Sequence, residues 1–276
     1  MKYRIAIIQM RSSMEVSKNL PVIEGLVREA AKNDVAAIFL PENFGALANP
    51  VPHSIGQLES TPFGPLRQLM STLAAETGCF IFAGTIPCRV RPDGSEVSGG
   101  RVRAASFVYD GNGIAVARYD KIHMFDVDVE DGHQHYLESA TFEPGEDIVC
   151  VETPLGKVGL SVCYDIRFPE LYRELFASGA ELIAIPSAFT RVTGEAHFEV
   201  LMRSRAIENF VFTIAACQGG THDSGRETYG HSMVVSPWGE VLCRGNDEQE
   251  VLYAELDLAE LEKIRRDMPV GKQRRL

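Results

Sequence analysis

Short runs of β-forming residues alternate with amphipathic helical stretches along the whole chain. Residues 4–9 and 36–40 are apolar runs of strand length, and residues 17–32 between them carry apolar side chains close to helical spacing. Both halves of the chain repeat an order of strand, helix and strand with β-hairpins inserted, and no Ser/Gly-rich linker separates them. We therefore expect one α/β domain, residues 1–276, whose sheets pack face to face with helices outside.

Turn and capping residues mark the ends of the other predicted elements. Residues 110–113 read Asp-Gly-Asn-Gly, a strong hairpin signal, Gly78 is a helix C-cap, and Pro169 begins a helix. The further predicted strands are 79–85, 103–109, 114–119, 157–162, 182–186, 210–216, 232–236, 240–242 and 251–256. The further predicted helices are 65–77, 169–178, 195–208 and 258–266. Residues 132–145 are predicted to form an irregular loop, and the basic tail 265–276 either frays or docks on a partner subunit.

The net charge restricts the kind of partner. The formal charge is −11 and the pI is near 5.2. An acidic protein repels polyanions, so we expect no nucleic-acid partner and no membrane partner. The first residues lack a signal peptide's apolar core and cleavage site, and no run approaches the roughly 20 apolar residues that span a bilayer. We expect a cytoplasmic protein whose six cysteines are reduced thiols, because a chain this long needs no disulfide framework.

Three predicted strands end in residues that can do chemistry, and Cys163 has the most informative surroundings. A buried strand stops there, residues 163–168 turn, and a helix begins at Pro169. In α/β sheets reactive groups gather just beyond the carboxyl ends of strands. Such a turn exposes the thiol and leaves backbone N–H groups to receive an oxyanion. The alternative is a buried structural cysteine.

Glu42 and Lys121 follow two other predicted strands. Glu42 comes after the apolar run 36–40, where loss of hydration favours the protonated form and suits a general base. Lys121 ends the second strand of the hairpin. For each residue taken alone, the commoner alternative is a loop carboxylate that accepts from backbone N–H groups for Glu42 and an ordinary solvated lysine for Lys121. Together with Cys163, they supply the nucleophile, base and cation that hydrolysis of an amide by a thiol requires.

The histidines form no recognisable metal site. His123, His133 and His135 lie close in the sequence, but no cysteine or carboxylate completes a ligand pattern. His197 and Glu199 form an H-x-E pair, as in glutamine amidotransferases, yet residues two apart on a helix point in different directions. We therefore expect neither a metal nor another cofactor.

At these positions the sequence resembles the nitrilase superfamily of carbon–nitrogen hydrolases. The resemblance covers essentially the whole chain and rests on Leu40-Pro41-Glu42, Tyr119-Asp120-Lys121-Ile122-His123 and Val162-Cys163-Tyr164-Asp165-Ile166-Arg167-Phe168-Pro169-Glu170. It implies a four-layer αββα sandwich that pairs into a homodimer or higher homo-oligomer. It also implies Cys163 as nucleophile, Glu42 as base and Lys121 as cation. The backbone N–H of Tyr164 would share the oxyanion with Lys121, and a second glutamate, Glu138, would orient Lys121 or the hydrolytic water.

Within this superfamily the chain is similar to the Nit amidase branch. The resembling stretches are residues 186–189, 193–199 and 229–235. They imply substrate contacts from Ser187, Phe189 and His231, although His231 alternatively satisfies a buried turn. The implied substrate is a small carboxamide of a 2-oxo acid, with deaminated glutathione ahead of 2-oxoglutaramate. An N-carbamoyl amino acid and a nitrile stay open as alternatives, because only pocket shape separates them.

An anionic substrate needs a local cation, because the net charge of the protein repels it. Arg191 and Arg226 are the candidates, whereas Arg167 lies so close to Cys163 that pairing with a nearby carboxylate is the expected role. Two other classes of protein are alternatives: a redox thiol protein, which needs no Glu or Lys partner, and a catalytically silent interaction module. An intact triad argues against the module, since an idle buried ionic cluster costs desolvation free energy.

Overall fold

The first of two six-stranded sheets is built mainly from the N-terminal half of the chain. The structure is a computed structural model that describes residues 1–48 and 53–275. The strands of this sheet are β1 (Lys2–Gln9), β2 (Ala37–Leu40), β3 (Phe80–Cys88), β4 (Arg103–Tyr109), β5 (Ala115–Asp120) and β16 (Glu250–Asp257). Their order is β16-β1-β2-β3-β4-β5, with β1, β2 and β3 parallel and the other pairs antiparallel.

The second sheet repeats this plan. Its strands are β8 (Cys150–Thr153), β9 (Gly156–Leu160), β10 (Leu182–Ala184), β11 (Phe212–Ala215), β14 (Met233–Val235) and β15 (Val241–Arg244). Their order is β15-β14-β11-β10-β9-β8, and the central strands β9, β10 and β11 are parallel. Each half thus has three parallel strands flanked by antiparallel ones.

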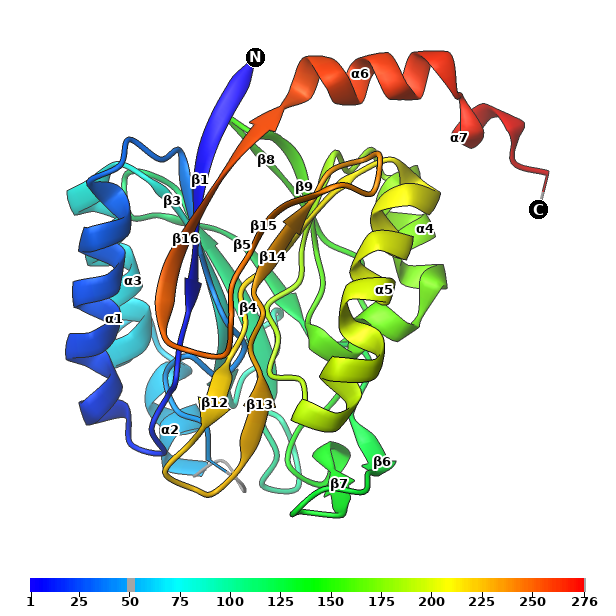
Figure 1. Cartoon of the computed structure of the whole chain (residues 1–276). Coiled ribbons are helices and arrows are strands. Elements are labelled where there is room, and N and C mark those ends of the chain that lie inside the picture. Colours follow the sequence, from blue (N-terminus) through cyan, green and yellow to red (C-terminus); the bar gives the residue numbers. More distant parts are fainter. Residues whose placement is uncertain (49–52, 276) are drawn as a thin grey trace.

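Helices cover the outer face of each sheet (Figure 1). α1 (Val16–Ala31) and α3 (Pro65–Thr77) lie over the first sheet, and α4 (Pro169–Ala177) and α5 (Arg191–Asn209) over the second. The short helix α2 (His53–Glu59) contacts β3. This arrangement confirms the predicted four-layer αββα sandwich.

Both faces of the first sheet are buried, as alternation along β1 shows. Ile5 and Ile7 pack in the core between the two sheets, whereas Ala6 and Ile8 pack with the apolar stripes of α1 and α3. All four side chains are inaccessible to solvent. A strand that is apolar on both faces reads as a continuous apolar run, and this pattern marked residues 4–9 as a buried strand.

Shorter elements lie at the ends of the sandwich. They are the strand pairs β6 (Asp126–Asp128) with β7 (His135–Leu137) and β12 (Gly219–Thr221) with β13 (Glu227–Tyr229), and the 3-10 helices Glu138–Ala140 and Cys163–Arg167. The prediction of an irregular loop over residues 132–145 is therefore wrong, since this segment contains β7 and a 3-10 helix. Three-residue strands show no detectable periodicity, which explains the error.

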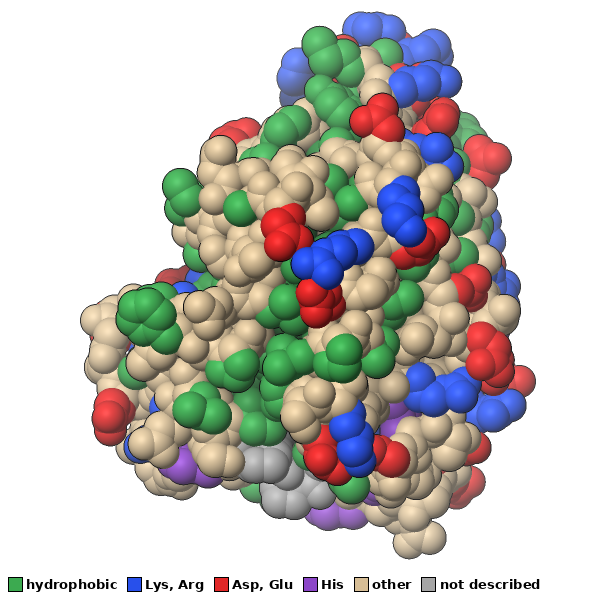
Figure 2. Space-filling model, turned by 90° about the vertical axis from the view of Figure 1, so that its left-hand side faces the viewer, with side chains coloured by type: hydrophobic (Ala, Val, Ile, Leu, Met, Phe, Trp, Pro, Cys, Tyr) green, Lys and Arg blue, Asp and Glu red, His purple; other side chains and the backbone are tan. Residues whose placement is uncertain are grey.

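The chain ends in α6 (Leu258–Asp267) and α7 (Val270–Gln273), which extend away from the sandwich at the top of Figure 1. Basic side chains gather at this end of the molecule (Figure 2). Arg265 nevertheless ties α6 to the body, because its guanidinium donates to the carbonyl oxygens of Phe210 and Ala180 at 2.9 and 2.6 Å. Within residues 1–48 and 53–275, no helix is long and apolar enough to cross a bilayer.

Candidate active site

Cys163 lies at a sharp turn between a strand and a helix. β9 ends at Leu160, Cys163 begins a 3-10 helix, and α4 follows. The φ angle of Cys163 is 49°, in the left-handed region that non-glycine residues rarely adopt. Its backbone N–H donates to the carbonyl oxygen of Pro186 at 3.0 Å, which holds the turn against the segment after β10. The geometry is that of a nucleophile elbow, in which local backbone strain presents the side chain at the sheet edge.

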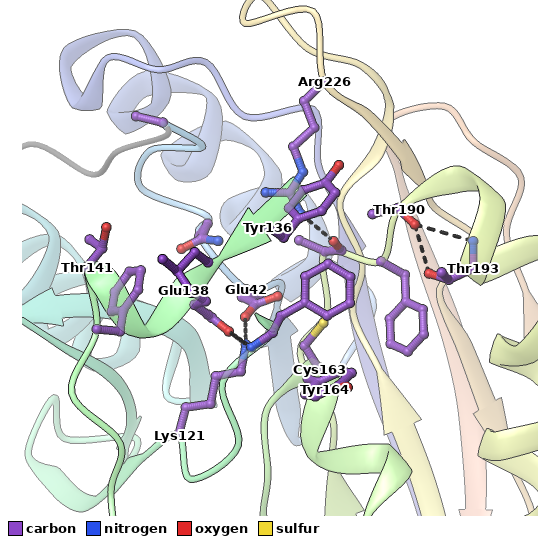
Figure 3. A pocket seen from close by; sticks show the side chains of 17 residues that line it. Glu42, Lys121, Tyr136, Glu138, Thr141, Cys163, Tyr164, Thr190, Thr193 and Arg226 are labelled. Carbon is purple, nitrogen blue, oxygen red and sulfur yellow. Dashed lines mark hydrogen bonds and ion pairs between the residues drawn. The ribbon is translucent and has the colours of Figure 1, made fainter. Parts of the chain in front are cut away.

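Glu42 and Lys121 come from the first sheet, just beyond β2 and β5. The Nζ atom of Lys121 lies 2.9 Å from Oε1 of Glu42 and 2.8 and 2.9 Å from the two carboxylate oxygens of Glu138 (Figure 3). Lys121 is 1% exposed and Glu42 is 4% exposed. The structure therefore brings together Cys163 and the three charged residues that the sequence proposed as its partners.

Lys121 is held as a cation by its neighbours. Burial opposes the charge, but the carboxylates of Glu138 and Glu42 outweigh this effect and raise the pKa of Lys121 well above its ordinary value. Burial also raises the pKa of Glu138, and Lys121 acts in the opposite direction. The ammonium group is thus available as a permanent donor to an oxyanion.

The thiol of Cys163 keeps its proton in the resting site. Burial and then the negative charge of Glu42 raise the pKa of Cys163 well above its ordinary value, although Lys121 and the backbone N–H of Ala188 act in the opposite direction. Attack by sulfur therefore requires a base that removes this proton as the reaction proceeds. Glu42 lines the same cavity and its negative charge acts on the thiol, so it is the candidate for that base.

A cavity opens beside Cys163 and Lys121 (Figure 3). Aromatic rings form much of its wall, and the ring of Phe125 lies 5.0 Å from that of Tyr136 and 5.1 Å from that of Tyr164. Its other lining residues are Glu42, Asn43, Ala48, Leu137, Glu138, Thr141, Phe142, Ala188, Phe189, Thr190, Thr193 and Arg226. The cavity thus combines aromatic rings with charged and hydroxyl side chains that converge on Cys163, as expected for a site that binds a small polar organic molecule.

Tyr164 and Phe189 line this cavity, but the predicted contact from Ser187 is not found there. Ser187 is fully buried behind the wall, and its hydroxyl donates to the carbonyl oxygen of Ile185 at 2.9 Å. Tyr164 lies in the first turn of a 3-10 helix, where backbone N–H groups have no acceptor within the helix. That N–H therefore has no acceptor within the helix, as the predicted role of oxyanion donor requires.

Arg191 and His231 also lie outside the cavity, along a separate surface groove. Arg191 is the first residue of α5, and its guanidinium approaches Glu227 at 3.9 Å. The Nδ1 atom of His231 lies 2.6 Å from the carbonyl oxygen of Tyr229. The contact of His231 agrees with the alternative role of satisfying a turn.

Arg226 is the arginine that reaches the cavity. One Nη atom donates to the carbonyl oxygen of Ala188 at 2.9 Å, and the guanidinium lies 5.7 Å from the ring centre of Tyr136. Its Nε atom is buried and has no hydrogen-bond partner among the residues that the structure describes. Arg226 thus brings a positive charge to the cavity wall, where a guanidinium can bind an anionic group of a ligand.

The histidine motifs have other partners. Arg167 contacts Nδ1 of His197 at 3.3 Å, and Glu199 forms an ion pair with Arg244 at 2.8 Å, so the H-x-E pair does not act as a unit. Arg167 also lies over the rings of Tyr164 and Phe189, and among the described residues it pairs with no carboxylate, so the expected ion pair is not found. Across the described parts of the chain, no three His, Cys, Asp or Glu side chains are grouped closely enough to hold a metal ion.

Sequence reasoning missed Tyr136 and the three threonines of the cavity, Thr141, Thr190 and Thr193. Thr190 is the N-cap of α5, and its Oγ1 accepts from the backbone N–H of Thr193 at 3.3 Å. A threonine before a helix is a recognisable start signal, but we placed the start of this helix at Glu195. Tyr136 lies on the three-residue strand β7, which gave no such signal.

The family follows from comparison with known proteins. The model of the family described as "Carbon-nitrogen hydrolase" matches residues 4–266. The chain therefore belongs to the carbon–nitrogen hydrolase family, as the resemblance in its three strand-end segments predicted.

Three relatives place the chain within this family. It is 39% identical to a deaminated glutathione amidase of Yersinia enterocolitica over 98% of this chain and 92% of that protein. It is 36% identical to an omega-amidase of Danio rerio over 99% of this chain and 95% of that protein. The crystal structure of the C. elegans NitFhit protein superposes with a TM-score of 0.88 at 32% identity, and the match covers 99% of this chain but only 65% of that one. These likenesses identify the chain as an amidase-type hydrolase of the Nit branch.

Proposed function

We propose that Cys163, Glu42, Lys121 and Glu138 hydrolyse a small carboxamide to an acid and ammonia through a thioester. The observation that supports this most directly is the buried ammonium of Lys121 between Glu42 and Glu138, beside the protonated thiol. Release of ammonia by the wild-type protein and its loss in Cys163→Ala test the proposal. Turnover by Cys163→Ala at the wild-type rate would show that another group is the nucleophile.

The proposed reaction begins with acylation of Cys163. Glu42 takes the thiol proton as sulfur attacks the amide carbonyl carbon, and the resulting oxyanion binds Lys121 and the N–H of Tyr164. When the carbon–nitrogen bond breaks, Glu42 passes its proton to the departing nitrogen, so that ammonia leaves and a thioester remains. Glu138 holds the ammonium of Lys121 in place throughout.

Deacylation uses the same groups in reverse. Glu42 takes a proton from water as the water oxygen attacks the thioester carbonyl, and the oxyanion again binds Lys121 and Tyr164. Collapse of this intermediate breaks the carbon–sulfur bond, and Glu42 returns the proton to Cys163. No redox step occurs, and none of these steps calls on a cofactor.

For the substrate we propose the amide of a 2-oxo acid, with deaminated glutathione ahead of 2-oxoglutaramate. The relatives support this class, and Arg226 supplies the cation that an anionic substrate needs in a protein of charge −11. The test compares kcat/KM for these two amides, an N-carbamoyl amino acid and a simple nitrile. A preference for either of the last two overturns the substrate class, whereas a preference for 2-oxoglutaramate makes the protein an omega-amidase with the same mechanism.

The role of Arg226 has a matched test. Succinamate and succinamide differ in a single carboxylate, so Arg226→Ala should raise the KM of succinamate about tenfold, as for loss of one charge-assisted hydrogen bond. The KM of succinamide should stay unchanged. Arg191→Ala is the control, because Arg191 lies in the other groove and should affect neither amide. An equal effect of Arg226→Ala on both amides would contradict carboxylate binding.

We further infer a cytoplasmic homodimer or higher homo-oligomer built from a single domain. All six cysteines are free, which suits a reducing compartment. Val200 and Ile207 on α5 are 66% and 45% exposed, and the nearby Trp238 is 61% exposed, so this helix presents an apolar surface that association would cover. Light scattering of wild type and Val200→Glu tests the assembly, and a wild-type monomer at micromolar concentration would contradict it.

A further inference from the structure

Asp165 is a fully buried carboxylate that no step of the proposed reaction uses. The Tyr119 hydroxyl and the Val162 N–H donate to its Oδ2 at 2.6 and 2.8 Å. The backbone N–H and the ring Nδ1 of His123 lie 3.0 and 2.7 Å from its Oδ1. An ionised carboxylate accepts about four hydrogen bonds, so this one is saturated. Saturation offsets the cost of burying its charge.

The donors come from both sides of Lys121 and from the turn of Cys163. Tyr119 stands two residues before Lys121, and His123 two residues after it. Val162 directly precedes Cys163, and Asp165 itself belongs to the 3-10 helix that Cys163 begins. A single carboxylate therefore joins the segment of the first sheet that carries the cation to the segment of the second sheet that carries the nucleophile.

Further contacts strengthen this connection. Hydrogen bonds to an ionised acceptor are roughly twice as strong as neutral ones. Since a carboxylate only accepts, Nδ1 of His123 carries the proton in this pair. The ring of His123 also stacks on that of Phe168, with centroids 3.7 Å apart and planes 6° apart, and Phe168 directly follows the 3-10 helix of Cys163. The Lys121 segment is thus held to this turn by polar and aromatic contacts together.

We propose that Asp165 is a positioning residue that sets where Lys121 lies relative to Cys163. The sulfur must reach the carbonyl carbon of the substrate while the ammonium reaches its oxygen, so a shift between the two segments weakens both interactions at once. Glu42 and Glu138 fix the ammonium group of Lys121, whereas Asp165 fixes the backbone that carries it. This inference rests on the proposed roles of Cys163 and Lys121.

Two variants test the connection, one by removing a single hydrogen-bond donor and the other by removing the charge of the acceptor. Tyr119→Phe removes one hydroxyl and keeps the buried ring, and Asp165→Asn removes the charge at nearly constant size. We expect kcat to fall about fivefold and about 100-fold respectively, as misplacement of reacting groups predicts. KM should change by less than about twofold, since neither variant alters the proposed contact between Arg226 and the carboxylate of the substrate. The double variant should be no slower than Asp165→Asn, because both changes act through one link.

Ser161→Ala is the matched control. The hydroxyl of Ser161 lies 2.9 Å from that of Tyr172 and donates to the carbonyl oxygen of Ala184 at 3.0 Å, so its loss removes buried hydrogen bonds beside the same turn without touching the Lys121 segment. Its melting temperature should fall while its kcat stays at the wild-type value. If Asp165→Asn behaves in this way too, Asp165 is only structural and the inference is wrong. The inference is also wrong if the decrease in kcat of the double variant equals the product of the decreases in Tyr119→Phe and Asp165→Asn.

The outcomes also separate this inference from the proposed function. An active Cys163→Ala defeats the proposed function, whatever Asp165 does. An inactive Cys163→Ala together with a fully active Asp165→Asn defeats only the positioning role. If Asp165→Asn does not fold, Tyr119→Phe carries the test alone, and an unchanged kcat in that variant overturns the inference.

Discussion

The Glu42→Gln variant distinguishes a role of Glu42 as the catalytic base from a role in stabilising the fold. The side-chain oxygen of Gln can still accept from Lys121, and Glu138 keeps its two contacts of 2.8 and 2.9 Å with the ammonium. The free energy of unfolding should therefore fall by only about 1–2 kcal/mol, the difference between a charged and a neutral acceptor. In contrast, kcat should fall about 10²–10⁴-fold, the range lost with a general base.

The same variant should make the Cys163 thiol easier to deprotonate, although it slows hydrolysis. Burial and then the negative charge of Glu42 raise the pKa of Cys163, so removal of that charge lowers this pKa. The midpoint of the pH dependence of Cys163 alkylation by iodoacetamide should move to lower pH, although hydrolysis is slower. Intact-protein mass spectrometry measures the alkylation, ammonia release measures kcat, and a thermal melt measures stability.

Glu138→Gln is the matched comparison for Glu42→Gln. It removes the other carboxylate paired with Lys121, so its effect on stability should be similar. Because Glu42 remains in place, kcat should fall by less than in Glu42→Gln. Wild-type turnover by Glu42→Gln with an unshifted melt would refute the base assignment, and so would an alkylation midpoint that moves to higher pH.

Three further predictions concern the nucleophile, the intermediate and the backbone beside Glu42. Alanine at Cys163 should abolish ammonia release, while alanine at each of the other five cysteines should preserve it; loss of activity in any of those five folded variants would contradict a single essential thiol. After a rapid acid quench, mass spectrometry should show an acyl adduct on Cys163, and its absence when deacylation limits turnover would argue against a thioester. Gly84→Ala would place a Cβ atom in a steric clash with the carbonyl oxygen of Pro41, so it should lower the free energy of unfolding in urea by roughly 3 kcal/mol or more, and an unchanged midpoint would show that the strand relaxes freely.

Much of the fold could be predicted because local signals and tertiary packing agree. The helix over residues 65–77 was predicted with the correct ends, since Pro65 starts it and Gly78 ends it with a φ of 69°. The strand Arg103–Tyr109 was also predicted correctly, as the hairpin signal after it fixes its end. The strands β6, β7 and β8 were not predicted, because no comparable turn or capping signal marks their ends.

The proximity of the proposed catalytic residues could be predicted from the sequence more fully than the residues that line the cavity, for a geometric reason. Glu42, Lys121 and Cys163 stand at strand ends, and the carboxyl ends of sheet strands meet at one edge. Arg191 and Arg226 offer no such rule. Arg191 is the first residue of α5 and lines the outer groove, whereas Arg226 lies in the loop between β12 and β13 and lines the cavity. Only the three-dimensional path of the chain distinguishes them.

The site depends on the packing between the two sheets as much as on the catalytic side chains. Phe39 on β2 stacks on Phe82 of β3, with ring centroids 4.4 Å apart, in the core shared by both sheets, and Glu42 follows Phe39 by three residues. Cys163 belongs to the other sheet, so its distance from Glu42 is set by how closely the inner faces approach. Interiors pack as densely as organic crystals and transmit small shifts, so a cavity at Phe39 would move the base relative to the nucleophile. Substitutions in this core should therefore lower both stability and turnover. Substitutions in the helices outside it should lower stability without lowering turnover.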